Sequence, residues 1–102
     1  MNVYIIDDET APRLILKHLL AQINTPTHIM GEANSLTEGI QDIKNNELTI
    51  DVLFLDIEMP RLNGFELLEK LGQVPFDVIF TTPSSTFTVI IFLLFFWLSS
   101  VA

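Results

Sequence analysis

The sequence contains no cysteine, so disulfide bonds and thiolate metal sites are excluded and the redox compartment stays undetermined. Basic residues are also scarce. Five lysines and arginines stand against thirteen aspartates and glutamates, which gives a formal net charge of −8 at pH 7. A surface with this charge repels the phosphate backbone of nucleic acids. We therefore expect no direct binding of DNA or RNA by this chain.

The N-terminus lacks the features of a secretory signal. No basic region precedes the first apolar run, which covers only Val3 to Ile6 before Asp7 interrupts it. At 102 residues the chain is long enough for one compact core, and a second folded domain is not expected. We expect a single domain in the cytoplasm.

Charge is absent from the C-terminal quarter of the sequence. All lysines, arginines, aspartates and glutamates lie between Asp7 and Asp77, whereas Val78 to Ala102 contains none. Apolar and amphipathic runs alternate along the chain. They predict strands over Val3–Ile6, His28–Ala33, Val52–Leu55 and Val78–Phe80, and helices over Ala11–Ile23, Leu36–Asn46 and Phe65–Leu71. This alternation, with its short connections, predicts an α/β fold with a doubly wound parallel sheet and right-handed crossovers.

Local patterns support these elements. The run Val52–Leu55 is continuously apolar, which is typical of a parallel strand covered by helices on both faces. In the first helix, apolar residues recur at helical spacing from Leu16 to Ile23. Ser35 and Glu38 have the spacing of a capping box at the start of the second helix.

Acidic residues follow two of the predicted strands. Asp7, Asp8 and Glu9 come directly after the first strand, and Asp56 comes directly after the third. Ligands of open parallel sheets bind outside the carboxyl ends of the strands, so these side chains converge if the two strands are neighbours. Like charges repel unless a cation lies among them, and an oxygen-lined site with few carboxylates suits Mg²⁺. The pattern predicts a magnesium site for phosphoryl transfer.

Asp56 is the best-placed nucleophile of this group, because a carboxylate can attack phosphorus and form an acyl phosphate. Thr82 follows the fourth strand and could offer its hydroxyl to a phosphate oxygen, with Thr81 as the competing choice. A plainer interpretation stays open for the three acids after the first strand, since acids before a helix often serve only as caps or dipole partners. His18 and His28 have no companion at metal-binding spacing, so we assign them no role.

The sequence resembles the receiver domain of bacterial response regulators in three motifs. These are Ile5-Ile6-Asp7-Asp8-Glu9, Leu53-Phe54-Leu55-Asp56-Ile57-Glu58-Met59-Pro60 and Asn63-Gly64-Phe65-Glu66-Leu67-Leu68. The run Val78-Ile79-Phe80-Thr81-Thr82 is similar to receivers that precede a LytTR-type DNA-binding output domain. The resemblance implies a flavodoxin-like (CheY-like) doubly wound parallel sheet with strand order 2-1-3-4(-5).

The resemblance also implies a role for each motif residue. A phosphohistidine of a sensor histidine kinase would donate its phosphoryl group to Asp56. Asp8 and Asp56 would bind Mg²⁺ directly, Asp7 would act through water, and Glu58 would contribute its backbone carbonyl. Thr82 would move to meet the phosphate. The protein is then a switch for a DNA-binding transcriptional output, which catalyses only its own phosphorylation and dephosphorylation and is no turnover enzyme.

Residues 83–102 depart from the receiver pattern. The family continues with a helix, a fifth strand that ends in a Lys-Pro pair and a fifth helix, whereas no lysine follows Lys70 here. We favour a truncated or altered receiver over residues 1–82, followed by an apolar tail that a frameshift or sequence error would explain. One alternative is a membrane tail, although Phe87 to Leu98 falls short of the roughly 20 residues that span a bilayer. Another is a substitute fifth strand over Phe87 to Phe92, formed within the chain or swapped in a homodimer.

Two other functions compete with the phosphoacceptor. The missing lysine and last helix favour a phosphorylation-incompetent receiver that acts as a protein-interaction module. A flavin-binding protein of the same fold class is disfavoured, because the loop after the first strand is acidic and lacks the Ser, Thr and Gly that cradle phosphate.

Overall fold

The computed structural model describes residues 1–72 and 74–81, in which strands and helices alternate along the chain. The elements are β1 (Asn2–Ile6), α1 (Thr10–Leu20), β2 (His28–Ala33), α2 (Leu36–Asn45), β3 (Val52–Asp56), α3 (Gly64–Leu71) and β4 (Asp77–Thr81). The strands form one sheet in the order β2-β1-β3-β4, and every adjacent pair is parallel. The expected doubly wound sheet with this strand order is confirmed. The expectations for a fifth strand, a membrane tail or a swapped element lie outside the described residues.

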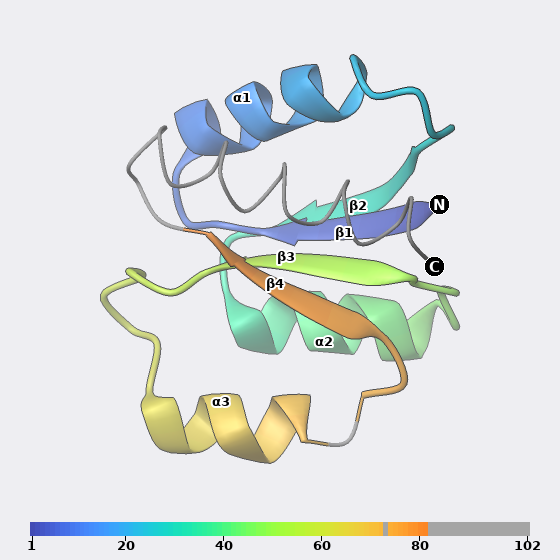
Figure 1. Cartoon of the computed structure of the whole chain (residues 1–102). Helices are drawn as coiled ribbons and strands as arrows, with labels where there is room; N and C mark the ends of the chain where they lie inside the picture. The colour runs from blue at the N-terminus through green and yellow to red at the C-terminus, as the bar shows by residue number, and fades with distance from the viewer. Residues whose placement is uncertain (73, 82–102) are drawn as a thin grey trace.

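Helices cover both faces of the sheet, with α1 on one side and α2 and α3 on the other (Figure 1). Alternate side chains of the central strands therefore enter two separate cores. The core beneath α1 contains Val3, Ile5, Leu16, Leu20, Val52 and Phe54. The core beneath α2 contains Tyr4, Ile6, Leu36, Ile40, Ile43, Ile50, Leu53, Leu55 and Met59. Strands buried on both faces explain the continuously apolar runs in the sequence.

Helix α1 ends earlier than its sequence pattern predicts. We expected it to reach Ile23, but it ends at Leu20. The amide of Gln22 donates to the carbonyl of Leu19 at 3.0 Å, a tight turn that closes the helix. Ile23 still packs against the core beneath α1. Its apolar side chain was therefore assigned to the correct core but to the wrong element.

Helix α2 begins with the predicted cap and lies close to the sheet. The amide of Glu38 donates to the Ser35 hydroxyl at 3.2 Å, which confirms this half of the capping box. Gly39 faces the side chain of Ile6, and a methyl group at Gly39 would come within 2.8 Å of Ile6 Cγ1. The missing side chain at position 39 therefore sets how closely α2 approaches β1.

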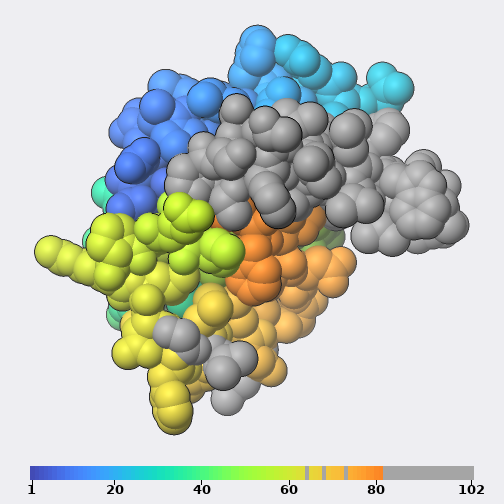
Figure 2. All heavy atoms as spheres, turned by 60° about the vertical axis from the view of Figure 1, so that its left-hand side comes forward, coloured from blue at the N-terminus to red at the C-terminus, as the bar shows by residue number. Residues whose placement is uncertain are grey.

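Because the strands are parallel, their carboxyl ends lie along one edge of the sheet, on the left in Figure 1. Figure 2 brings that side forward and shows the blue N-terminal region beside the yellow-green loop that follows β3. Among the described residues, no helix has the length and apolar character that crossing a bilayer requires. The carboxyl edge is thus the place where two loops from neighbouring strands meet.

Candidate functional site

Three aspartates meet at the carboxyl edge of the central strands. Asp56 is the last residue of β3, and Asp7 directly follows β1, whose residue Ile6 pairs with Leu55. Asp7 and Asp56 are buried, with 7% and 5% of their surfaces exposed, whereas Asp8 is exposed. One carboxylate oxygen from each of the three aspartates lies within 4.8 Å of the others, close enough for a single cation to contact all three. The convergence depends on β1 and β3 being neighbours, as the strand order makes them.

Main-chain amides orient the two buried carboxylates. Asp7 Oδ1 accepts a hydrogen bond from the amide of Glu9 at 3.0 Å, and Asp56 Oδ1 accepts one from the amide of Glu58 at 2.9 Å. The residue at the N-cap of α1 is Glu9, and its side chain makes no capping hydrogen bond. Glu9 therefore occupies the N-cap position without a side-chain cap, its role as a dipole partner stays a prediction, and the Asp7 carboxylate orders the turn before the helix.

The electrostatics of the cluster are unfavourable without a cation. The pKa of the Asp7 carboxyl is raised from its ordinary 3.8 to about 6, because burial and then the neighbouring carboxylates of Asp56 and Asp8 raise it by more than the Glu9 amide lowers it. Three acids this close suit a hard divalent ion, and Mg²⁺ binds oxygen ligands of this kind. The donor set therefore fits the expected metal.

Sequence reasoning missed Arg13. Its guanidinium donates to the main-chain carbonyl of Asp7 and, at 2.8 Å, to Asn34 Oδ1, so it lies directly behind the acidic turn. A signal was present in the sequence, because Arg13 lies in the N-terminal part of a predicted helix. A cation there is opposed by the helix dipole, so an ion partner outside the helix was to be expected.

Comparison with known proteins decides what kind of domain this is. A family model for the response regulator receiver domain matches residues 3–94. The chain belongs to this family. Receivers are signalling domains and not conventional enzymes, they interact with histidine kinases and output domains, and they generally bind Mg²⁺ at an acidic pocket. The resemblance found in the sequence is thereby confirmed.

The relatives of this receiver are response regulators. An uncharacterised response regulatory protein of Vibrio cholerae is 39% identical over 83 residues, covering 80% of this chain and 34% of the relative. The transcriptional regulatory protein BtsR of Escherichia coli K12 is 41% identical over 71 residues, covering 70% and 28%. The sensory transduction protein LytT of Bacillus anthracis is 33% identical over 85 residues, covering 80% and 33%. The receiver thus spans about a third of the length of these relatives, and the similarity to LytT agrees with the LytTR-linked type.

The structure describes some of the remaining predicted site residues of the receiver but not all of them. Thr81, the competing choice, is buried at the end of β4 and pairs with Asp56 in the sheet register. Thr82 lies outside the described residues, so its role stays a prediction. Glu58 lies in the loop after β3, and the contact of its backbone carbonyl with the metal also stays a prediction. His18 belongs to no group of metal ligands within residues 1–72 and 74–81.

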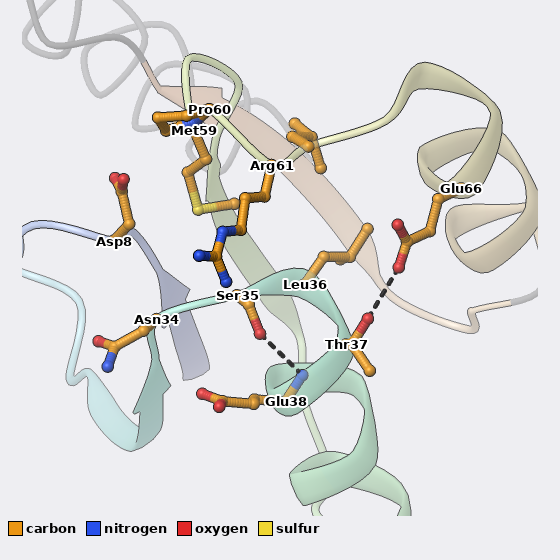
Figure 3. Close-up of a pocket in the computed structure, with 11 residues that line it drawn as sticks. Asp8, Asn34, Ser35, Leu36, Thr37, Glu38, Met59, Pro60, Arg61 and Glu66 are labelled. Atoms are coloured by element: carbon orange, nitrogen blue, oxygen red, sulfur yellow. Dashed lines mark hydrogen bonds between the residues drawn. The ribbon is translucent and has the colours of Figure 1, made fainter.

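A cleft of about 480 Å³ reaches Asp8 of the receiver and lies between the start of α2 and the loop after β3 (Figure 3). Its lining consists of Asp8, Asn34, Ser35, Leu36, Thr37, Glu38, Met59, Pro60, Arg61, Leu62 and Glu66. Asp8 contributes both to this cleft and to the cluster, so the exposed side of the metal site opens toward it. Open space therefore lies beside Asp8.

Proposed function

We propose that this receiver accepts a phosphoryl group on Asp56 from a phosphohistidine of a sensor histidine kinase. The observation that carries the proposal is the position of Asp56, buried at the end of a central strand within cation-sharing distance of Asp7 and Asp8. A carboxylate oxygen of Asp56 would attack phosphorus as the bond between phosphorus and the imidazole nitrogen breaks, and this nitrogen would take up a proton from water, so that a neutral imidazole leaves. The product is an acyl phosphate.

The three aspartates divide the work of binding the metal. Asp8 and Asp56 would hold Mg²⁺ directly, with the backbone carbonyl of Glu58, and Asp7 would act through water. When bound, Mg²⁺ neutralises negative charge on the transferring phosphoryl group. The Glu58 amide keeps Asp56 Oδ1 in a fixed direction, so the nucleophile needs little reorganisation before attack. The hydroxyl of Thr82 would contact a phosphate oxygen afterwards.

The partners follow from this reaction. Leu14 and Ile15 on α1 are 56% and 51% exposed, and they offer an apolar surface on the helix that follows the acidic turn, where a kinase domain could dock. By analogy with BtsR, a transcriptional regulatory protein, we propose that the whole protein carries a DNA-binding output domain and works in the cytoplasm. The interaction-only alternative is less favoured, because a binding module has no need of three converging aspartates.

Phosphorylation by acetyl phosphate with Mg²⁺, read by intact mass, tests the proposal. We expect a gain of roughly 80 Da, one phosphoryl group, on the wild-type chain. Asp56→Asn should abolish the gain. Asp77→Asn is the matched control, because Asp77 is an exposed aspartate at the start of β4, and it should leave the gain intact. No gain in folded wild-type protein would leave only a receiver-shaped interaction module.

A further inference from the structure

Arg13 connects three segments behind the acidic turn. Its Nε donates to Glu32 Oε1 at 3.1 Å at the end of β2, and its Nη1 donates to Asn34 Oδ1 at 2.8 Å in the turn before α2. The same Nη1 donates to the carbonyl of Asp7, and Nη2 lies 3.4 Å from the hydroxyl of Thr10. The side chain is only 14% exposed. A single guanidinium therefore ties α1, β2 and the end of β1 together.

The carbonyl contact bears on the direction of two acidic side chains. The amide of Asp7 donates to the carbonyl of Ala33 at 3.1 Å, so the main chain at Asp7 is held on both sides, by β2 and by Arg13. The Asp7 carbonyl belongs to the peptide unit that joins Asp7 to Asp8. Because a peptide unit is planar, fixing its carbonyl limits the directions that both side chains can take. The arginine thus acts on the acids through their main chain.

We propose that Arg13 is a positioning residue for the metal-binding acids, which fixes the Asp7–Asp8 peptide unit so that both carboxylates face the cation. The inference rests on the metal-assisted function proposed above and assigns the positioning to this chain's own arginine. A planar fork with several donors is required, because one group must reach a carbonyl, an amide oxygen and a carboxylate together. A lysine carries the charge but not the fork.

The structure supplies a control for a merely structural role. Lys17 donates to Glu32 Oε2 at 2.7 Å, so it shares the Glu32 carboxylate with Arg13 on the same helix. No contact of Lys17 with the Asp7 carbonyl is present among the described residues. Lys17→Gln therefore removes an ion pair between α1 and β2 and leaves the acidic turn in place.

Two measurements on Arg13→Gln, Arg13→Lys and Lys17→Gln test the inference. The first is the Mg²⁺ dissociation constant by titration calorimetry. The second is the hydrogen-exchange rate of the Glu9 amide in metal-free buffer, since that amide donates to Asp7 Oδ1. We expect about tenfold weaker Mg²⁺ binding and faster exchange in both Arg13 variants, within the range seen when residues that orient metal ligands are replaced. Lys17→Gln should match the wild type in both measurements.

Each outcome decides a separate point. Unchanged affinity and exchange in folded Arg13→Gln would overturn the inference, and so would wild-type values in Arg13→Lys, because charge alone would then suffice. Equal losses in Lys17→Gln would assign the effect to the ion pairs of Glu32. If Arg13→Gln does not fold, Arg13→Lys decides on the same measurements. If the wild type binds no Mg²⁺, the proposed function fails, while exchange at Glu9 still reports on Arg13.

Discussion

Asp7 and Asp56 are held in the same way at the ends of neighbouring strands. Each accepts a hydrogen bond through Oδ1 from the amide two residues further along, at 3.0 Å from Glu9 and 2.9 Å from Glu58. These bonds fix two buried acids beside each other, and neither can turn away to reduce the repulsion. The metal-free receiver therefore carries an electrostatic cost, which protonation, removal of a charge or a bound cation relieves.

Replacement of Asp7 by Asn should make the metal-free protein more stable at neutral pH. The folded pKa of about 6 lies above the ordinary 3.8, so folding favours the protonated form. The contribution of protonated Asp7 to the free energy of unfolding is complete below about pH 4 and is lost as pH rises through about 6. At ~1.4 kcal/mol per pH unit, this contribution is at most about 3 kcal/mol. Urea unfolding with EDTA between those pH values should show this loss in the wild type. If the free energy of unfolding falls with pH equally in wild type and in Asp7→Asn, Asp7 is not the source of the loss.

Magnesium should stabilise the folded receiver against unfolding. At ten times the dissociation constant, a ligand that binds only the folded state adds about 1.4 kcal/mol to the free energy of unfolding. Asp8→Asn should remove this gain, whereas Glu9→Gln should keep it, because Glu9 lies outside the group of converging carboxylates. Thermal unfolding in MgCl₂ and in NaCl of equal ionic strength separates ion binding from screening. A gain that persists in Asp8→Asn would place the ion elsewhere.

Tyr4 should resist ionisation at alkaline pH. Its hydroxyl is buried and donates to Asp42 Oδ2 at 2.6 Å, and burial first, then this hydrogen bond and the Asp42 charge, raise its pKa well above the ordinary value of 10.0. The stability that the protonated Tyr4 hydroxyl contributes is complete below the ordinary pKa of 10.0 and is lost as pH rises through the higher pKa of the folded state. Tyr4 is the sole tyrosine of the chain, so ultraviolet absorbance reports on it alone. Asp42→Asn should shift the titration to lower pH, and an unchanged midpoint would count against the role of Asp42.

Gly39→Ala should destabilise the receiver although alanine favours helices. The added methyl group would meet Ile6 Cγ1 at 2.8 Å and Cδ1 still closer, so the buried Ile6 side chain or α2 itself must shift. Overpacking typically costs about 1–3 kcal/mol, against a helix-propensity gain of up to ~1 kcal/mol. Gln41→Ala, on the exposed side of the same helix, should be close to neutral. Adding Ile6→Val to Gly39→Ala should recover part of the loss, and a double-mutant cycle that shows simple additivity would reject the contact.

Much of the fold could be predicted because the signals are local. The apolar run Val52–Leu55 and the alternation of elements specify a parallel sheet covered on both faces, and the strand order then brings Asp7 beside Asp56. The end of α1 could not be predicted in this way. Ala21 to Ile23 contains neither proline nor glycine, and the tight turn from the Gln22 amide to the Leu19 carbonyl has no counterpart in the apolar spacing.

The missed contacts in the site have a different cause. Arg13 acts through a main-chain carbonyl, and every residue supplies a carbonyl, so composition gives no sign of which one is used. Tyr4 and Asp42 are separated by 38 positions and meet only when α2 docks on β1. The metal-binding aspartates could be found from their spacing in the sequence. The contacts of Arg13 and of Tyr4 with Asp42 became visible only in the folded structure.

The pairing of β1 with β3 has a consequence for how the receiver folds. Val3 pairs with Val52, so the two central strands come from distant parts of the chain and can pair only after a long loop has closed. Pairs of this kind form slowly during folding. Asp7 follows β1 and Asp56 ends β3, so a collapsed intermediate in which these two strands are unpaired has no cluster of acids. Magnesium binding during refolding would thus report the moment at which β1 and β3 pair.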